Sequence, residues 1–143
     1  AVEYESYVKQ NSENREYSEK YSQEQAAEVA LAQKVMDIRQ KELDADKTKV
    51  VERLNQIWDQ FSPEQKQQLQ QDQSDWFEKR DVDCKVIAQK NVYQLADNDK
   101  EIYQKKSDYW DDAMRQQNEA MQYTKCFNQK TTERIIYLNN IFN

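Results

Sequence analysis

The sequence of 143 residues contains no glycine and a single proline, Pro63. Glycine normally supplies the positive φ angles of tight turns, and it makes up about 7% of an average chain. A sheet protein of this length would need many such turns. The missing glycine therefore argues against a sheet and predicts few turns joined by long helices.

Histidine is also absent, which removes the commonest general base and the commonest metal ligand. Without glycine there is no glycine-rich phosphate loop, and the two cysteines are too few for a structural zinc site. The carboxylate pairs Asp81 with Asp83 and Asp111 with Asp112 could serve acid–base chemistry, but adjacent acids on a solvated helix are usually surface charge. We predict that the protein is not an enzyme and that it holds no cofactor and no metal.

Apolar residues are scarce and charged residues are plentiful, at 37% and 34% of the chain. Average domains have about 45–50% and about 25%. This balance predicts narrow apolar stripes on elongated helices rather than a broad core. Disorder is the alternative interpretation, and the nine tyrosines and three tryptophans argue against it.

The formal net charge is −6, and the basic residues are interspersed with acidic ones. Such a surface repels nucleic acid and attracts basic partners. No window reaches the roughly 20 apolar residues that a membrane span needs. We therefore predict a protein partner, no nucleic acid and no membrane insertion; the oligomeric state is left open.

Helical spacing of apolar residues organises the first half of the chain. The spacing of Tyr17 and Tyr21 predicts a helix within residues 1–24, and one long helix is predicted over residues 25–61. Its apolar positions fall close to one helical face. They are Leu31, Val35, Ile38, Val50, Leu54, Ile57 and Phe61.

The segment Ser62-Pro63-Glu64-Gln65 has the form of a helix start, with a capping serine, a proline at the first position and a glutamine that completes a capping box. A helix is therefore predicted from Pro63, a turn near residues 95–99, a third helix from Asp97 or Asp99 to Asn128, and a last helix over residues 131–142. The apolar positions of these three helices are Leu69, Trp76, Cys84 and Ile87, then Ile102, Tyr109, Ala113, Met114, Met121 and Phe127, then Ile135, Leu138 and Phe142. The predicted fold is all-α, an elongated bundle of about four helices with a long helical hairpin.

Two local groups of residues allow a functional and a structural interpretation. Trp76-Phe77 with Arg80 could form an exposed hot spot for a partner, but packing of the guanidinium over Trp76 is favoured. An acidic and aromatic group could seek a basic partner, with a solvated helix face as the default. That candidate partner surface consists of Asp108, Trp110, Asp111 and Asp112.

The two cysteines, Cys84 and Cys126, allow one disulfide or two unrelated thiols. A bridge would close a loop of about 43 residues and stabilise the fold by roughly 4 kcal/mol. Composition alone does not decide between the two.

The stretch from Leu69 to Cys84 carries the skeleton L-x3-Q-x2-W-x3-R-D-x2-C, which resembles the signature of the LprI-type lysozyme inhibitor family. Upstream, Glu42-Leu43-Asp44, Leu54, Trp58 and Lys66 agree with it, and downstream Cys126-x4-Thr131-x2-Arg134-x3-Leu138 resembles the closing element of that family. The motif residues are Leu69, Gln73, Trp76, Arg80, Asp81, Thr131, Arg134 and Leu138.

The resemblance implies a helical domain, a location in the periplasm or outside the cell (the bacterial envelope), and a disulfide that joins Cys84 to Cys126. Residues 1–40 lie outside the match, so we predict a polar helical extension over residues 1–40 and an LprI-like helical domain over residues 41–143. At helical spacing the first motif shares one face, which would dock on the last helix. The motif is therefore predicted to be mainly structural, with Asp81 and Arg134 as a conceivable pair across the junction.

The function implied by the resemblance is binding to a protein in the envelope, with inhibition of a basic lysozyme or another cell-wall hydrolase by steric occlusion. The alternative is a helical interaction module, such as an immunity-type or envelope-assembly protein. The N-terminal segment favours this alternative, because helix beyond a complete domain usually adds a binding surface.

Overall fold

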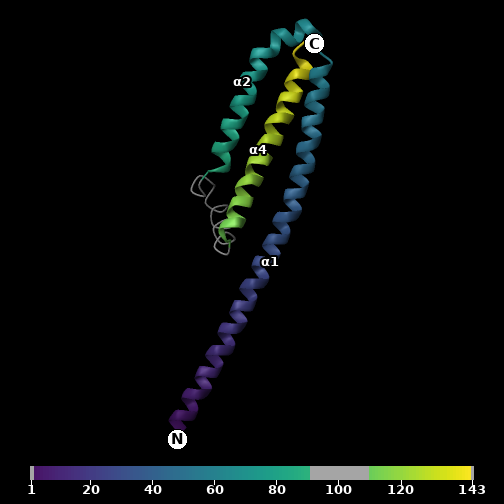
Figure 1. The fold of residues 1–143 in the computed structure, drawn as a ribbon. Coiled ribbons are helices and arrows are strands. Elements are labelled where there is room, and N and C mark those ends of the chain that lie inside the picture. The colour runs from purple at the N-terminus through teal and green to yellow at the C-terminus, as the bar shows by residue number, and fades with distance from the viewer. Residues whose placement is uncertain (1, 91–109, 143) are drawn as a thin grey trace.

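The computed structural model describes residues 2–90 and 110–142. All regular structure in these residues is helical and forms α1 (Val2–Asp59), α2 (Pro63–Ala88) and α4 (Asp112–Asn140). Figure 1 shows an elongated bundle in which α4 lies between α2 and the C-terminal half of α1, antiparallel to α2 and parallel to α1. The predicted all-α fold with a long helical hairpin is confirmed, with three helices in the described part of the chain rather than about four.

Helix α1 unites the two N-terminal segments that were predicted separately. It has 58 residues, which at 1.5 Å per residue makes it about 87 Å long. No glycine or proline precedes Pro63, so nothing in the local sequence interrupts it. The predicted boundary at residue 40 falls inside this helix, and the division of the chain into an extension and a domain stays a prediction.

The turn between α1 and α2 takes only three residues. The Gln60 and Phe61 amides donate to the carbonyls of Ile57 and Trp58, at 3.2 and 3.1 Å, which tightens the end of α1. The Ser62 Oγ accepts from the Gln65 amide at 3.1 Å, and the Gln65 side chain accepts from the Ser62 amide at 3.0 Å. The predicted capping box and helix start at Pro63 are confirmed. No described residue has a positive φ, so this turn is made without the conformation that favours glycine.

The C-terminal helix corrects the prediction of two helices separated between Asn128 and Thr131. Helix α4 runs through these residues without a break, because the intervening Gln129 and Lys130 are good helix formers and no breaker lies between them. Its N-cap is Asp111, whose carboxylate accepts from the Met114 amide at 2.8 Å. The predicted turn at residues 95–99, with its caps Asp97 and Asp99, lies outside the described residues.

In residues 2–90 and 110–142, two small core clusters lie along α4, and Cys84, Cys126 and Phe127 are buried as well. One cluster lies near the turn, and the other lies where α4 begins beside the middle of α1. The buried members of the first are Leu54, Ile57, Leu69, Ile135 and Leu138, and those of the second are Met36, Met114 and Met121. These narrow clusters are what the low apolar content predicts.

The predicted buried face of α1 is partly wrong. Leu31, Val35 and Ile38 are 63, 56 and 59% exposed, and the chain instead packs Val29, Ala32 and Met36 toward α4. Two apolar faces compete in this region, and periodicity selected the one with the larger aliphatic residues. The neighbouring helix takes the other face, which carries the flexible methionine and small alanine.

Three further apolar positions predicted on buried faces are also exposed. Ile87 and Phe142 lie near helix ends and are 41 and 42% exposed, and Ala113 lies in the first turn of α4, where it is exposed. Ile102 and Tyr109 lie outside the described residues.

Candidate functional site

The motif face of α2 docks against α4 and is fastened by the disulfide between Cys84 and Cys126. The two Cα atoms are 5.5 Å apart, and the bridge spans 42 positions of sequence. The implied pairing is therefore confirmed. Both cysteines are buried, so the cross-link lies inside the helix–helix contact and not on its edge.

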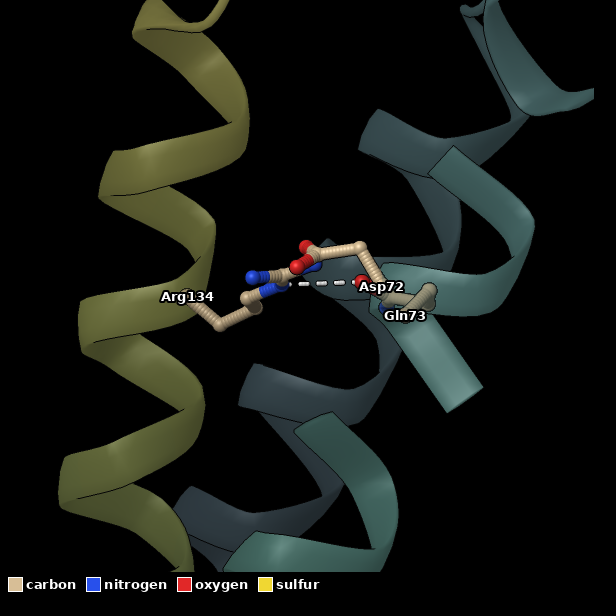
Figure 2. Close-up of polar contacts among 3 residues, drawn as sticks. All are labelled: Asp72, Gln73 and Arg134. Atoms are coloured by element: carbon tan, nitrogen blue, oxygen red, sulfur yellow. Dashed lines mark hydrogen bonds and ion pairs between the residues drawn. The ribbon is translucent and has the colours of Figure 1, made fainter. Parts of the chain in front are cut away.

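Arg134 is the charged residue of the motif with the least exposure, at 8%. Its Nε donates to the Gln73 Oε1 at 2.8 Å, and its Nη2 pairs with the Asp72 carboxylate (Figure 2). The guanidinium also lies over the rings of Trp76 and Tyr137, at 5.4 and 4.7 Å from their centroids. Asp72 is about half exposed, so the buried arginine reaches out of the core to its counter-charge, as buried charges require.

Arg80 fills the next gap between α2 and α4. Its Nη1 donates to the Thr131 Oγ1 at 3.1 Å, and Thr131 is fully buried. The guanidinium carbon lies 3.9 Å from the Phe127 ring centroid and 4.8 Å from that of Trp76. Burial lowers the pKa of this guanidinium, while the charges of Tyr123 and Asp81 raise it. The structure thus places Arg80 over Trp76, as favoured from the sequence, with Phe77 at the edge of the same contact.

Asp81 does not pair with Arg134, which corrects the suggestion made from the sequence. It accepts from the Tyr123 hydroxyl at 2.6 Å and forms an ion pair with Lys85 at 3.0 Å. The hydrogen bond from Tyr123, and then the contact with Lys85, lower the pKa of the Asp81 carboxyl. The same hydrogen bond raises the pKa of the Tyr123 hydroxyl. Arg134 lies about three turns nearer the C-terminus of α4 than Tyr123. Because α2 and α4 are antiparallel, it meets Asp72, nearer the start of α2, and not Asp81.

These motif contacts link α2 with α4, and the polar groups are directed at one another. That the motif is mainly structural stays a prediction, with which these helix–helix contacts agree. In the described ranges, no three histidine, cysteine, aspartate or glutamate side chains are grouped as metal ligands.

The candidate partner surface is only partly described. Trp110 is half-buried and packs against the methionine cluster. Asp111 is exposed but its carboxylate caps α4, and Asp112 pairs with Arg115 at 3.5 Å. Asp108 lies outside the described residues. These contacts assign helix-start positions to Asp111 and Asp112, and their use by a partner stays a prediction.

Several contacts between α1 and α4 were not anticipated. Gln117 donates to the Asp37 carboxylate at 3.0 Å and to the Gln40 Oε1 at 2.7 Å, and it accepts from Gln33 at 2.8 Å. The hydrogen bonds from Gln117 and Gln33 lower the pKa of the Asp37 carboxyl. Glutamine is so frequent in this chain that the sequence offered no reason to select these positions. They could have been predicted only if the side of α1 that faces α4 had been known.

The N-terminal half of α1 extends past the other described helices, and we call residues 2–28 the free half. Every residue from 2 to 24 is exposed, and Figure 1 shows this half projecting beyond α2 and α4. Seven acidic and three basic residues lie in it, a net charge of −4 out of −6 for the whole chain. Most of the net negative charge of the chain is therefore carried by this projecting part of α1.

No described helix combines the length and the apolar character that crossing a membrane requires.

Comparison with known proteins identifies one family. The family model described as lysozyme inhibitor LprI matches residues 9–138, so the match includes most of the N-terminal segment that the sequence motifs left out. No curated protein and no solved structure matches the chain. Because the family model covers most of the sequence and the disulfide joins the two motif cysteines, the chain belongs to the LprI lysozyme inhibitor family.

Proposed function

We propose that this protein binds a basic lysozyme or a related cell-wall hydrolase and inhibits it by steric occlusion. The observation that carries the proposal is the family match over residues 9–138, since the family is one of lysozyme inhibitors. A protein partner also agrees with the shape of the molecule, because a long exposed helix offers a large contact area.

Inhibition of this kind needs no chemistry from the inhibitor. The chain has no histidine and no glycine. The carboxylates suggested as an acid–base pair have other neighbours, because Asp81 accepts a hydrogen bond from Tyr123 and the Asp83 Oδ2 lies 3.8 Å from the Lys130 Nζ. Its acidic surface would steer a cationic enzyme toward it and would weaken binding as salt is added.

The proposed place of action is outside the cytoplasm, in the periplasm or the secreted fraction. The disulfide between Cys84 and Cys126 supports this, because such bridges persist in oxidising compartments and are rare where thioredoxin and glutathione keep thiols reduced. A cell-wall hydrolase would be met in the same compartment.

A second candidate function is a helical interaction module, such as an immunity-type or envelope-assembly protein. The free half of α1 favours it, since that half contributes nothing to the two core clusters and would be available to a partner other than a lysozyme.

The test is a titration of a basic c-type lysozyme with the oxidised protein, read both as binding and as lysis of cell-wall suspensions, at low and at high salt. We expect binding with a matching loss of lysis, and weaker binding at high salt. An acidic helical protein of equal net charge is the control for unspecific attraction. Binding no tighter than that control, with lysis unchanged, would exclude inhibition and leave the interaction module as the better candidate.

A further inference from the structure

The free half of α1 continues the face by which α1 packs on α4. In residues 29–59 of α1, which we call the docked half, this face includes Val29, Ala32 and Met36. Steps of three and four residues extend the same face toward the N-terminus. Seven positions of the free half follow this spacing, and we call them the tyrosine seam. They are Tyr4, Tyr7, Asn11, Asn14, Ser18, Tyr21 and Gln25.

Charge is excluded from the tyrosine seam. None of its seven positions is charged, whereas ten of the other twenty positions in the free half are acidic or basic. A helix that was solvated equally on all sides would have no reason for this separation. The pattern is that of a contact face, although no described residue covers it.

The side chains of the tyrosine seam suit a reversible protein–protein contact. Tyr4, Tyr7 and Tyr21 are 70, 63 and 51% exposed, and tyrosine is enriched at binding hot spots because it combines a large ring with a polar tip and little rotamer entropy. The asparagines and serine between them keep the face compatible with water when no partner is bound. The Tyr21 hydroxyl accepts from the Gln25 side chain at 3.2 Å, so two seam residues support each other.

The charge around the seam decides which occupant fits it. The free half has seven acidic and three basic residues, whereas the other 116 residues have 20 and 18. A second copy of this helix laid along the seam would bring two net charges of −4 together, which is unfavourable. A basic protein surface would instead gain from the acidic residues that flank the tyrosines.

We propose that the tyrosine seam is the surface that contacts the basic partner, with Tyr4, Tyr7 and Tyr21 as its anchors. The identity of this partner as a lysozyme rests on the proposed function. The bundle then serves as the support that holds a preformed helix in the solvent.

The experiment compares lysozyme binding by the full-length oxidised protein, by a triple seam variant (Tyr4→Ser, Tyr7→Ser, Tyr21→Ser) and by Tyr17→Ser. Tyr17 is a matched control, because it lies in the same helix, is 73% exposed and is off the seam. Serine and tyrosine have similar helix propensities, and circular dichroism verifies that the helix remains. We expect the triple variant to lose affinity by at least about 100-fold, since hot-spot residues each contribute about 30-fold or more, and Tyr17→Ser to change it by less than about 3-fold.

A second variant tests the charge argument without altering the seam. Glu3→Gln, Glu24→Gln and Glu28→Gln together remove three acids that are three or four positions from seam residues. We expect a loss of affinity at low salt that disappears at high salt, because charges at an interface rim act through screened attraction.

The outcomes separate this inference from the proposed function. Wild-type protein that does not bind lysozyme would overturn both. Binding and inhibition that survive in the triple variant, or that fall equally in Tyr17→Ser, would overturn the seam and leave the function intact. Self-association of the wild type that the triple variant abolishes, with lysozyme binding unchanged, would assign the seam to a second copy and also overturn the proposal.

Discussion

The two halves of α1 have the same secondary structure and opposite surroundings. Residues 29–59 supply Met36, Leu54 and Ile57 to the core, whereas residues 2–24 bury nothing. The difference comes from helix length: α4 has 29 residues and α1 has 58, so α4 can cover only about 44 of about 87 Å. Helix formation therefore depends on local sequence, but burial depends on what lies alongside.

Removal of the disulfide between α2 and α4 should have the largest effect on the stability of the helical bundle. Replacing Cys84 and Cys126 together by serine should lower the free energy of unfolding by roughly 4 kcal/mol, because the unfolded chain regains the entropy of an open loop. Urea unfolding followed by tryptophan fluorescence measures it, since all three tryptophans lie outside the free half. Wild-type protein under reducing conditions is the control and should behave like the double variant, and equal stability of oxidised wild type and variant would contradict the prediction.

Proline substitutions contrast the two halves directly. Lys49→Pro, on an exposed position of the docked half, should cost about 3 kcal/mol or more. Ser18→Pro breaks the same helix in the free half and should change the unfolding of the bundle by less than about 0.5 kcal/mol.

Far-UV circular dichroism should fall in Ser18→Pro while its tryptophan unfolding curve stays in place. A bundle destabilised equally by both prolines would mean that the free half contributes to the stability of the docked half.

Leucine truncations test burial at a finer scale. Leu138 is 1% exposed and Leu31 is 63% exposed. Leu138→Ala should cost about 3 kcal/mol through lost burial and a cavity, and Leu31→Ala less than about 0.5 kcal/mol. Thermal or urea unfolding distinguishes them, and a large cost at Leu31 would show that its face is covered.

The smallest effect concerns acid stability at the α2–α4 contact. Because the pKa of Asp81 is lowered in the fold, its contribution is present above its ordinary pKa of about 4 and is lost as pH falls through the lower, folded value. Tyr123→Phe removes the main cause of that shift. Between about pH 5 and about pH 2, the melting temperature should therefore fall less in the variant than in the wild type. Equal decreases in the two proteins would contradict the assigned effect of Tyr123 on Asp81.

The candidate site was predictable in its residues but not in its pairings. Helical spacing placed the first motif on one face of α2, and the resemblance implied the Cys84–Cys126 bridge, which the structure contains. The partner of Arg134 was missed: it is Asp72 with Gln73, not Asp81. Which groups meet across two helices depends on their relative rotation and offset, and neither is encoded in the spacing along one helix.

By itself, the sequence determined the all-helical class and the start of α2, because the lack of glycine, the single proline and the capping box at Ser62 act over a few neighbouring residues. The sequence also indicated the family, because the spacing of the motif residues can be recognised without a structure. The tertiary structure alone decided that Leu31, Val35 and Ile38 are exposed and that no described residue packs on residues 2–24 of α1. Burial requires two surfaces in contact, and the spacing of residues along one helix does not say which other helix packs on it.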